Sequence, residues 1–181
     1  MLERPSPLPE EDSLSGLLCG SRGPLPSAGT AETCILIKAG ERIFIVDAGD
    51  GSITNLRDWG IDLGKVEAFF LTHTHSDHFS DLADLHLNAW ITQNRTDKLK
   101  VYGPEGTQSV TDGFEATYAL DYKWRYEHHG NVVAPIEFAG FDTHIIDIES
   151  SIVIEDNDLK VTAFLVKHDP VKPSVGYRFD Y

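Results

Sequence analysis

Short apolar runs separated by turn residues make up most of this chain, a pattern typical of a β-rich protein with interspersed helices. Strand-like runs occupy residues 15–19, 33–38, 42–46, 66–71, 99–102, 143–148, 151–154 and 160–166. Apolar residues at helical spacing predict helices over residues 53–59, 82–90 and 107–118. Ser80 is the expected N-cap of the second helix. The alternation of strands and helices predicts an α/β protein.

Two regions lie outside this pattern. Residues 1–14 begin with a stretch rich in proline and acidic residues, which predicts a mobile N-terminal arm before one domain over residues 15–181. The aromatic and charged segment 121–131 has no clear periodicity. Its three alternating aromatic residues are Tyr122, Trp124 and Tyr126. We expect them in the core, and the alternative is that they stack on a ring of the substrate.

Length and composition indicate one globular domain. The 181 residues include 41% hydrophobic and 24% charged residues, and no stretch approaches the roughly 20 apolar residues that span a bilayer. The first 30 residues lack the basic and apolar regions of a secretory signal. Cys19 and Cys34 lie in apolar, strand-like surroundings and are expected to be buried thiols rather than a disulfide. These features predict a cytoplasmic protein without a membrane partner.

The chain is strongly acidic. Its formal net charge of −14 would repel polyanions over most of the surface, so binding a long nucleic acid would require a local basic patch. The basic residues are scattered, and Lys98 and Lys100 come closest to a cluster. The acidic balance is compatible with a site that binds divalent cations.

The stretch Thr72–Asp81 contains three histidines in an H-x-H-x-D-H string directly after an apolar run. His73 and His75 are two residues apart, so in an extended chain they point the same way and can bind one metal ion. Asp77 and His78 follow where the chain turns, and they can face a second ion. Imidazole and carboxylate together suit zinc, manganese or iron. Neither pair saturates a metal, so a ligand from elsewhere in the chain is required.

Three motifs together resemble the metallo-β-lactamase-fold superfamily of binuclear metal hydrolases. Residues 70–78 match its main metal motif, and Asp47 within residues 46–51 matches its early strand-end aspartate. Residues 163–168, followed by Gly176-Tyr177-Arg178, look like the motif that delivers a further histidine. Two glycine-proline turns, at residues 19–26 and 103–106, resemble those of the tRNA 3′-processing endonuclease (tRNase Z) and its arylsulfatase-like relatives. The resemblance covers residues 15–181.

The resemblance implies a four-layer αββα sandwich, of which this chain supplies the first half to two-thirds. It implies two zinc ions, with manganese or iron as alternatives. His73, His75 and His168 would bind the first ion, and Asp77 and His78 the second. Asp77 would also be the catalytic general base. Asp47 would brace the metal loop without binding metal.

The implied activity is hydrolysis by a metal-bound hydroxide of a phosphodiester or a related ester such as an aryl sulfate. The acidic balance favours a small-molecule ester over transfer RNA. A β-lactam or lactone hydrolase on the same scaffold is an alternative, and so is a non-catalytic metal-binding or partner-binding module. We expect the complete protein to form a homodimer.

One departure from the family pattern is informative. The family has a bridging aspartate in a G-D-T context after the G-Y-R strand, and a last histidine later still. This chain stops at Asp180-Tyr181, so we expect an N-terminal fragment or one half of a split enzyme. An incomplete sheet would expose an unpaired edge and favour association.

The remaining polar candidates are assigned to structural or surface positions. Asp81 is expected in the first turn of its helix, interacting with the helix dipole, and His86 on the helix face. His128 and His129 are expected in a surface loop, with a place in a substrate pocket as the alternative. His144 is expected to be structural.

Overall fold

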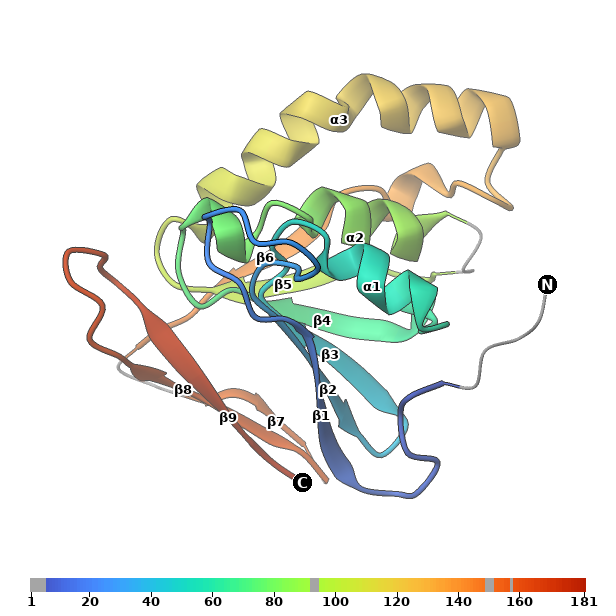
Figure 1. Ribbon diagram of the computed structural model, residues 1–181. Helices are drawn as coiled ribbons and strands as arrows, with labels where there is room; N and C mark the ends of the chain where they lie inside the picture. The colour runs from blue at the N-terminus through green and yellow to red at the C-terminus, as the bar shows by residue number, and fades with distance from the viewer. Residues whose placement is uncertain (1–5, 92–94, 149–151, 157) are drawn as a thin grey trace.

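The computed structural model describes residues 6–91, 95–148, 152–156 and 158–181. A six-stranded sheet and a three-stranded sheet face one another, and helices cover the outer face of the larger sheet (Figure 1). This arrangement accounts for three of the four layers that the family resemblance implies. No helix covers the outer face of the smaller sheet within the described part of the chain.

The strands of the larger sheet follow one another in chain order. They are β1 (Leu14–Gly20), β2 (Cys34–Ala39), β3 (Arg42–Val46), β4 (Val66–Phe70), β5 (Leu99–Gly103) and β6 (Phe141–Ile145). Strands β1, β2 and β3 pair antiparallel, and β3 to β6 pair parallel. Parallel strands are covered on both faces, which explains the nearly continuous apolar sequences of β3 and β4.

Each parallel connection passes through a helix on the same side of the sheet (Figure 1). The helices are α1 (Ser52–Asp58), α2 (Leu82–Trp90) and α3 (Thr107–His129), with short 3-10 turns η1 (Leu63–Lys65), η2 (Ser76–His78) and η3 (Ile136–Phe138). Helix α3 extends well past the predicted end at residue 118. Its second half is polar and carries ion pairs one turn apart, Asp121 with Arg125 and Lys123 with Glu127. Gly130 then ends the helix.

The smaller sheet contains β7 (Ile152–Glu155), β8 (Lys160–Leu165) and β9 (Val175–Asp180), all antiparallel. Aromatic rings fill the space between the sheets. The fully buried Phe70 ring lies 5.0 Å from Tyr177, 5.5 Å from Phe179 and 5.3 Å from Tyr102, measured between centroids. These contacts fix β9 over the centre of the larger sheet.

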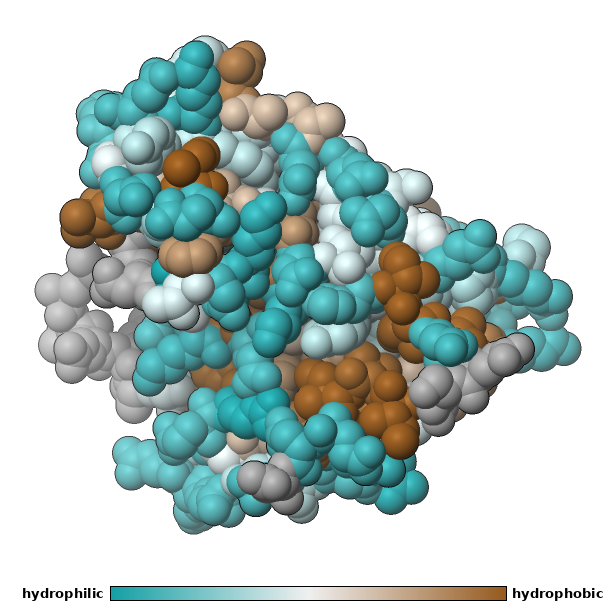
Figure 2. Space-filling model, turned by 180° about the vertical axis from the view of Figure 1, so that it is seen from behind, coloured by the Kyte–Doolittle hydropathy of each residue, from teal (hydrophilic) through white to brown (hydrophobic). Residues whose placement is uncertain are grey.

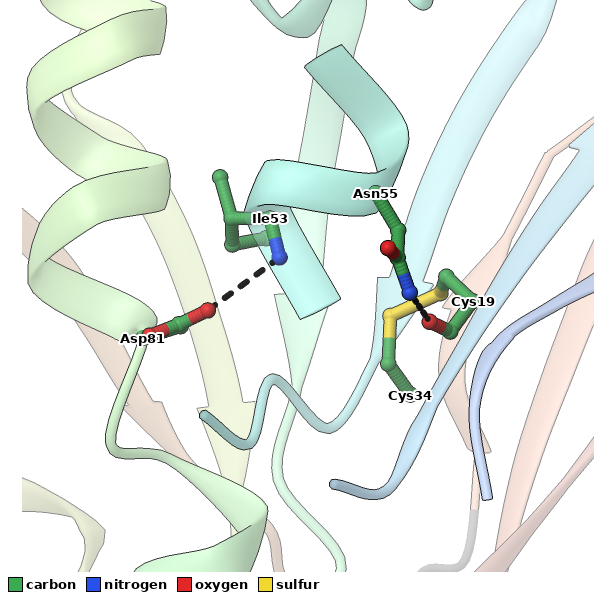
Figure 3. Close-up of a disulfide and its surroundings, with 5 residues drawn as sticks. All are labelled: Cys19, Cys34, Ile53, Asn55 and Asp81. Atoms are coloured by element: carbon green, nitrogen blue, oxygen red, sulfur yellow. Dashed lines mark hydrogen bonds between the residues drawn. A yellow bond between two sulfur atoms is a disulfide. The ribbon is translucent and has the colours of Figure 1, made fainter. Parts of the chain in front are cut away.

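The prediction of two free thiols is wrong, because Cys19 and Cys34 form a disulfide (Figure 3). Both residues are buried, as expected. A register shift between Leu18 and Gly20 brings the two Cα atoms to 5.1 Å, within the range that a disulfide requires. Spacing alone could not reveal this register. The cytoplasmic location, which the thiols supported, stays a prediction.

The segment that the sequence left unassigned belongs to α3, and this corrects two expectations. Tyr122 is buried, but Trp124 is 59% exposed and Tyr126 is also exposed, because a helix turns successive residues to different faces. His128 and His129 end the helix instead of lying in a loop.

His86 lies on helix α2, as expected, and the face of the helix that carries it is buried. Its side chain is only 2% exposed, inside a cluster with Trp90 and Tyr122, and Nε2 accepts a hydrogen bond of 2.9 Å from the Gly140 N–H. His144 stacks on the Tyr102 ring with centroids 4.8 Å apart, which fits a structural position.

The chain begins its first strand at Leu14, and Leu8 before it packs against the main core. The division into an arm and a domain stays a prediction. No helix in the described ranges is long and apolar enough to cross a membrane.

Strands β1, β6, β7 and β9 lie at the edges of their sheets. Several exposed side chains of these strands are apolar, among them Leu14, Leu18, Ile145 and Ile152. Figure 2 shows the molecule from behind, with brown hydrophobic areas interrupting a largely hydrophilic surface. Association through these edges stays a prediction.

Candidate metal centre

The histidine string follows the carboxyl end of β4, at the edge of the sheet where open α/β proteins place their sites. Residues from Leu71 to His75 are not helical, and the chain then turns through η2. The Leu71 N–H donates to the Tyr102 carbonyl at 2.8 Å, and the Asp47 N–H donates to the Phe70 carbonyl at 2.9 Å. These bonds attach the start of the string to both neighbouring strands.

Three histidine side chains converge at this edge. The ligand atoms of His73, His75 and His168 all lie within 4.8 Å of one another, and His73 Nε2 is 3.1 Å from His75 Nδ1. Burial, together with the three neighbouring histidines, lowers the pKa of His73 to about 4. His73 is therefore neutral at pH 7, as a metal ligand must be. His75 and His168 are exposed, which leaves one side open to water.

Contacts between the smaller sheet and the metal loop bring the distant His168 to this place. The Val175 N–H donates to the Thr72 carbonyl at 3.0 Å, and the Tyr177 hydroxyl donates to the Leu71 carbonyl at 2.6 Å. His168 lies in the β8–β9 connection, where its carbonyl accepts from the Val171 N–H at 2.8 Å. Both sheets are therefore needed to assemble the triad.

Asp77 and His78 lie beside the triad. His78 Nε2 is 3.6 Å from Asp77 Oδ2, and the His73 and His78 ring centroids are 4.0 Å apart. Asp77 is buried. The triad is the only group of three or more metal-binding side chains found among the described residues, so this pair has no third such donor there.

Asp47 connects to both parts of the site. Its Oδ1 accepts from the Thr72 N–H at 2.9 Å, while Oδ2 accepts from the Thr72 hydroxyl at 2.8 Å and lies 2.7 Å from His78 Nδ1. Burial lowers the pKa of His78, but the Asp47 hydrogen bond and charge outweigh it and raise the pKa overall. With Nδ1 held by Asp47, Nε2 of His78 faces Asp77. This geometry fits the bracing position that the family resemblance implies.

Asp47 is also the only non-glycine residue with positive φ, at 58°, in the described ranges. Such a conformation is disfavoured for most side chains and is often found at functional sites. The three hydrogen bonds of its carboxylate hold it in place.

Sequence reasoning missed a second support of the metal loop. The buried Glu32 accepts from the Asp50 N–H at 3.0 Å and from the Ser80 hydroxyl at 3.4 Å, and it pairs with Arg22 at 3.4 Å. Ser80 therefore contacts Glu32 and is not the helix cap that the sequence predicted. Nothing in the local sequence around Glu32 indicates this contact.

Asp81, which directly precedes α2, interacts with a different helix from the one expected. It makes no side-chain cap bond to α2. Its Oδ2 instead accepts from the Ile53 N–H at the start of α1, at 3.2 Å (Figure 3). Burial raises the pKa of Asp81 to about 6.

The comparisons with known proteins agree with this architecture. The model of the metallo-beta-lactamase superfamily matches residues 28–181. A ribonuclease Z from Mycolicibacterium gilvum (strain PYR-GCK) is 28% identical over 166 residues, which are 91% of this chain and 56% of that protein. The crystal structure of the short form of human tRNase Z has a TM-score of 0.65 at 21% identity, covering 91% of this chain and 62% of that one. Zinc-bound PqqB from Methylobacterium extorquens has a TM-score of 0.56 at 14% identity, covering 91% and 61%.

The chain thus spans a little over half the length of the relatives that it matches, in agreement with the expected half to two-thirds of the fold. The two structural likenesses, both under 25% identical, establish the fold alone. The family model covers most of the chain and includes both the histidine string and His168. The chain therefore belongs to the metallo-beta-lactamase superfamily.

Proposed function

We propose that this chain carries the metal-binding part of a zinc-dependent hydrolase that resembles ribonuclease Z. The observation that carries the proposal is the convergence of His73, His75 and His168 within 4.8 Å. Three imidazoles with one open side are the donor set of catalytic zinc sites, where Zn–N distances are about 2.0–2.1 Å. Zinc bound there would supply Lewis-acid chemistry, polarising an ester oxygen and lowering the pKa of water to about 7.

The protein side chains have separate tasks in this proposal. Asp77 and His78 would hold a second zinc ion, with manganese or iron as alternatives. Asp77 Oδ2 lies 3.6 Å from His78 Nε2 and is the proposed general base that accepts a proton from the attacking water. Asp47 holds His78 Nδ1 and Thr72, and so orients the histidine string.

The proposed substrate is a phosphodiester or a related ester, and a small molecule in preference to transfer RNA. The ribonuclease Z relatives support phosphodiester chemistry. The net charge of −14 disfavours a long polyanion. The nearest cations to His168 along the chain are also paired, because Lys167 and Lys172 lie 4.0 and 2.9 Å from Asp169.

We also propose that the complete protein is a homodimer and that it is located in the cytoplasm.

Metal analysis with matched histidine variants tests the proposal. The wild-type chain should bind at least one equivalent of zinc, and His75→Ala and His168→Ala should each lose it. The exposed His128, at the far end of α3, provides the control, and His128→Ala should bind zinc normally. Zinc binding below one equivalent in the wild type would contradict the metal site.

Three chromogenic substrates then separate the candidate activities. The proposal expects turnover of bis-p-nitrophenyl phosphate. Turnover of p-nitrophenyl sulfate or of a chromogenic β-lactam in its place would favour those alternatives. Zinc binding without turnover of any of the three would favour a non-catalytic metal-binding module.

A further inference from the structure

A groove beside the metal centre is not used by the site described above. It has a volume of about 700 Å³ and lies between the metal loop and α3, within the roughly 300–1,000 Å³ range of ligand pockets. Its walls include Thr74, Phe79, Val110, Gly113, Phe114 and Tyr118. We propose that this groove binds an uncharged aromatic group of the substrate; this inference rests on the proposed function.

Two lining residues of the groove are chain neighbours of the proposed metal ligands. Thr74 lies between His73 and His75 in the chain, and Phe79 directly follows His78. The turn before α3 closes one side, since a Cβ on Gly106 would lie 3.2 Å from Thr74 Cγ2. A group in the groove would therefore contact the loop that carries the proposed metal ligands.

The lining of the groove selects for neutral aromatic groups. None of its nine lining residues carries a charge, although the chain has a net charge of −14. Phe79 and Phe114 meet edge to face with centroids 6.2 Å apart, and Tyr118 lies 6.5 Å from Phe114. All three rings are only partly buried, so part of each remains available for contact. Partly exposed rings of this kind bind nucleobases and aryl groups by stacking and edge contacts.

Gly113 keeps the groove open. It lies within α3, where glycine is less favourable than alanine, and a Cβ built on it would meet nothing within 4 Å. Because Gly113 lines the groove, a larger side chain there would occupy it without removing any packed group. This position therefore offers a blocking variant that leaves the core intact.

Two phosphate esters that differ only in the ring provide the test. Isothermal titration of the zinc-loaded chain should show that phenyl phosphate binds roughly tenfold more tightly than methyl phosphate. The variants Gly113→Leu and Phe114→Ala should each lose most of this preference. Leu120→Ala is the matched control, because Leu120 is 58% exposed on the same helix and does not line the groove. Its preference should equal that of the wild type.

Equal affinities of the two esters for the wild type would overturn the inference. Retention of the preference in Gly113→Leu would do the same, and this variant remains informative if Phe114→Ala does not fold. A third titration, with uridine monophosphate, distinguishes a nucleobase from an aryl group as the ring that the groove binds. Tighter binding than phenyl phosphate indicates a nucleotide substrate, and weaker binding indicates an aryl ester.

A metal-free arm distinguishes failure of this inference from failure of the proposed function. Benzyl alcohol, which needs no metal, should shift the amide NMR signals of residues 109–118, and ethanol should not. A chain that binds benzyl alcohol there but no zinc contradicts the proposed function alone. A chain that binds zinc and both phosphate esters equally contradicts the groove assignment alone.

Discussion

Acidification should destabilise the protein through His86, which is buried under the helical layer. Its Nε2 accepts a hydrogen bond from the Gly140 N–H at 2.9 Å, so protonation would remove an acceptor and place a charge in a buried site. Burial, together with the charges of Arg95 and Lys98, lowers the pKa of His86 to about 4. The folded protein therefore disfavours the imidazolium form.

The sign and size of this pH effect on folding stability follow from the difference between the His86 pKa values of the unfolded and folded chains. The unfolded chain binds a proton at His86 near pH 6.5, whereas the folded chain does so only near pH 4. Stability from the neutral ring is fully present above pH 6.5, and it is lost as the pH falls from there toward 4. Since one pKa unit corresponds to about 1.4 kcal/mol, the loss should reach about 2–3 kcal/mol at a pH of about 4.5.

Urea unfolding followed by tryptophan fluorescence measures this effect. The free energy of unfolding of the wild type and of His86→Gln should be compared between about pH 7.5 and 4.5, in the presence of a chelator. The glutamine side chain of this variant can still accept the Gly140 hydrogen bond but cannot gain a charge. The variant is expected to be less stable at neutral pH, and the difference should shrink as the pH falls. His128→Gln, at an exposed helix end, should follow the wild-type profile.

Parallel losses of stability in the wild type and His86→Gln would refute the reasoning. Groups that titrate elsewhere, His73 among them, contribute equally to both proteins and cancel in the comparison. A pH-independent difference would mean that His86 contributes packing alone.

Three further outcomes are expected. Phe70→Ala should lower the free energy of unfolding by about 3–5 kcal/mol, because it empties the space between the two sheets; a loss below about 1 kcal/mol in urea unfolding would contradict the packing. Replacing Cys19 and Cys34 by serine should cost about 3 kcal/mol, as expected for a disulfide whose cysteines are 15 residues apart; an unchanged melting temperature would contradict a structural contribution. Gly49→Ala should weaken zinc binding roughly tenfold or more, because the new Cβ would lie 2.1 Å from the Asp77 carbonyl oxygen; unaltered zinc affinity by titration would show that the loop yields without moving the site.

Much of the fold could be predicted from local pattern. The apolar runs predicted strands β2, β3, β4 and β5 to within a residue or two. The buried parallel strands are easy to recognise, because both of their faces are covered and their sequences are continuously apolar. The end of α3 was missed, since its second half has few apolar residues and is held by side-chain pairs that periodicity does not detect.

The metal site also has one part that local sequence predicts and one part that it does not. The spacing of His73 and His75 is local, so the sequence alone predicted that both could face one metal ion, and the structure brings them together. His168 depended on the family resemblance, because nothing in its local sequence connects it to the string.

Residue type and local spacing were enough to predict most of the strands, the side chains that can bind metal and the acidic character of the chain. These properties depend on residue type and on spacing over a few positions. Only the three-dimensional contacts show that Cys19 and Cys34 are bonded, that Glu32 supports the metal loop and that an aromatic groove lies between this loop and α3. Each of these depends on strand register or on contacts between distant segments, which the pairing of the sheets establishes and local sequence does not encode.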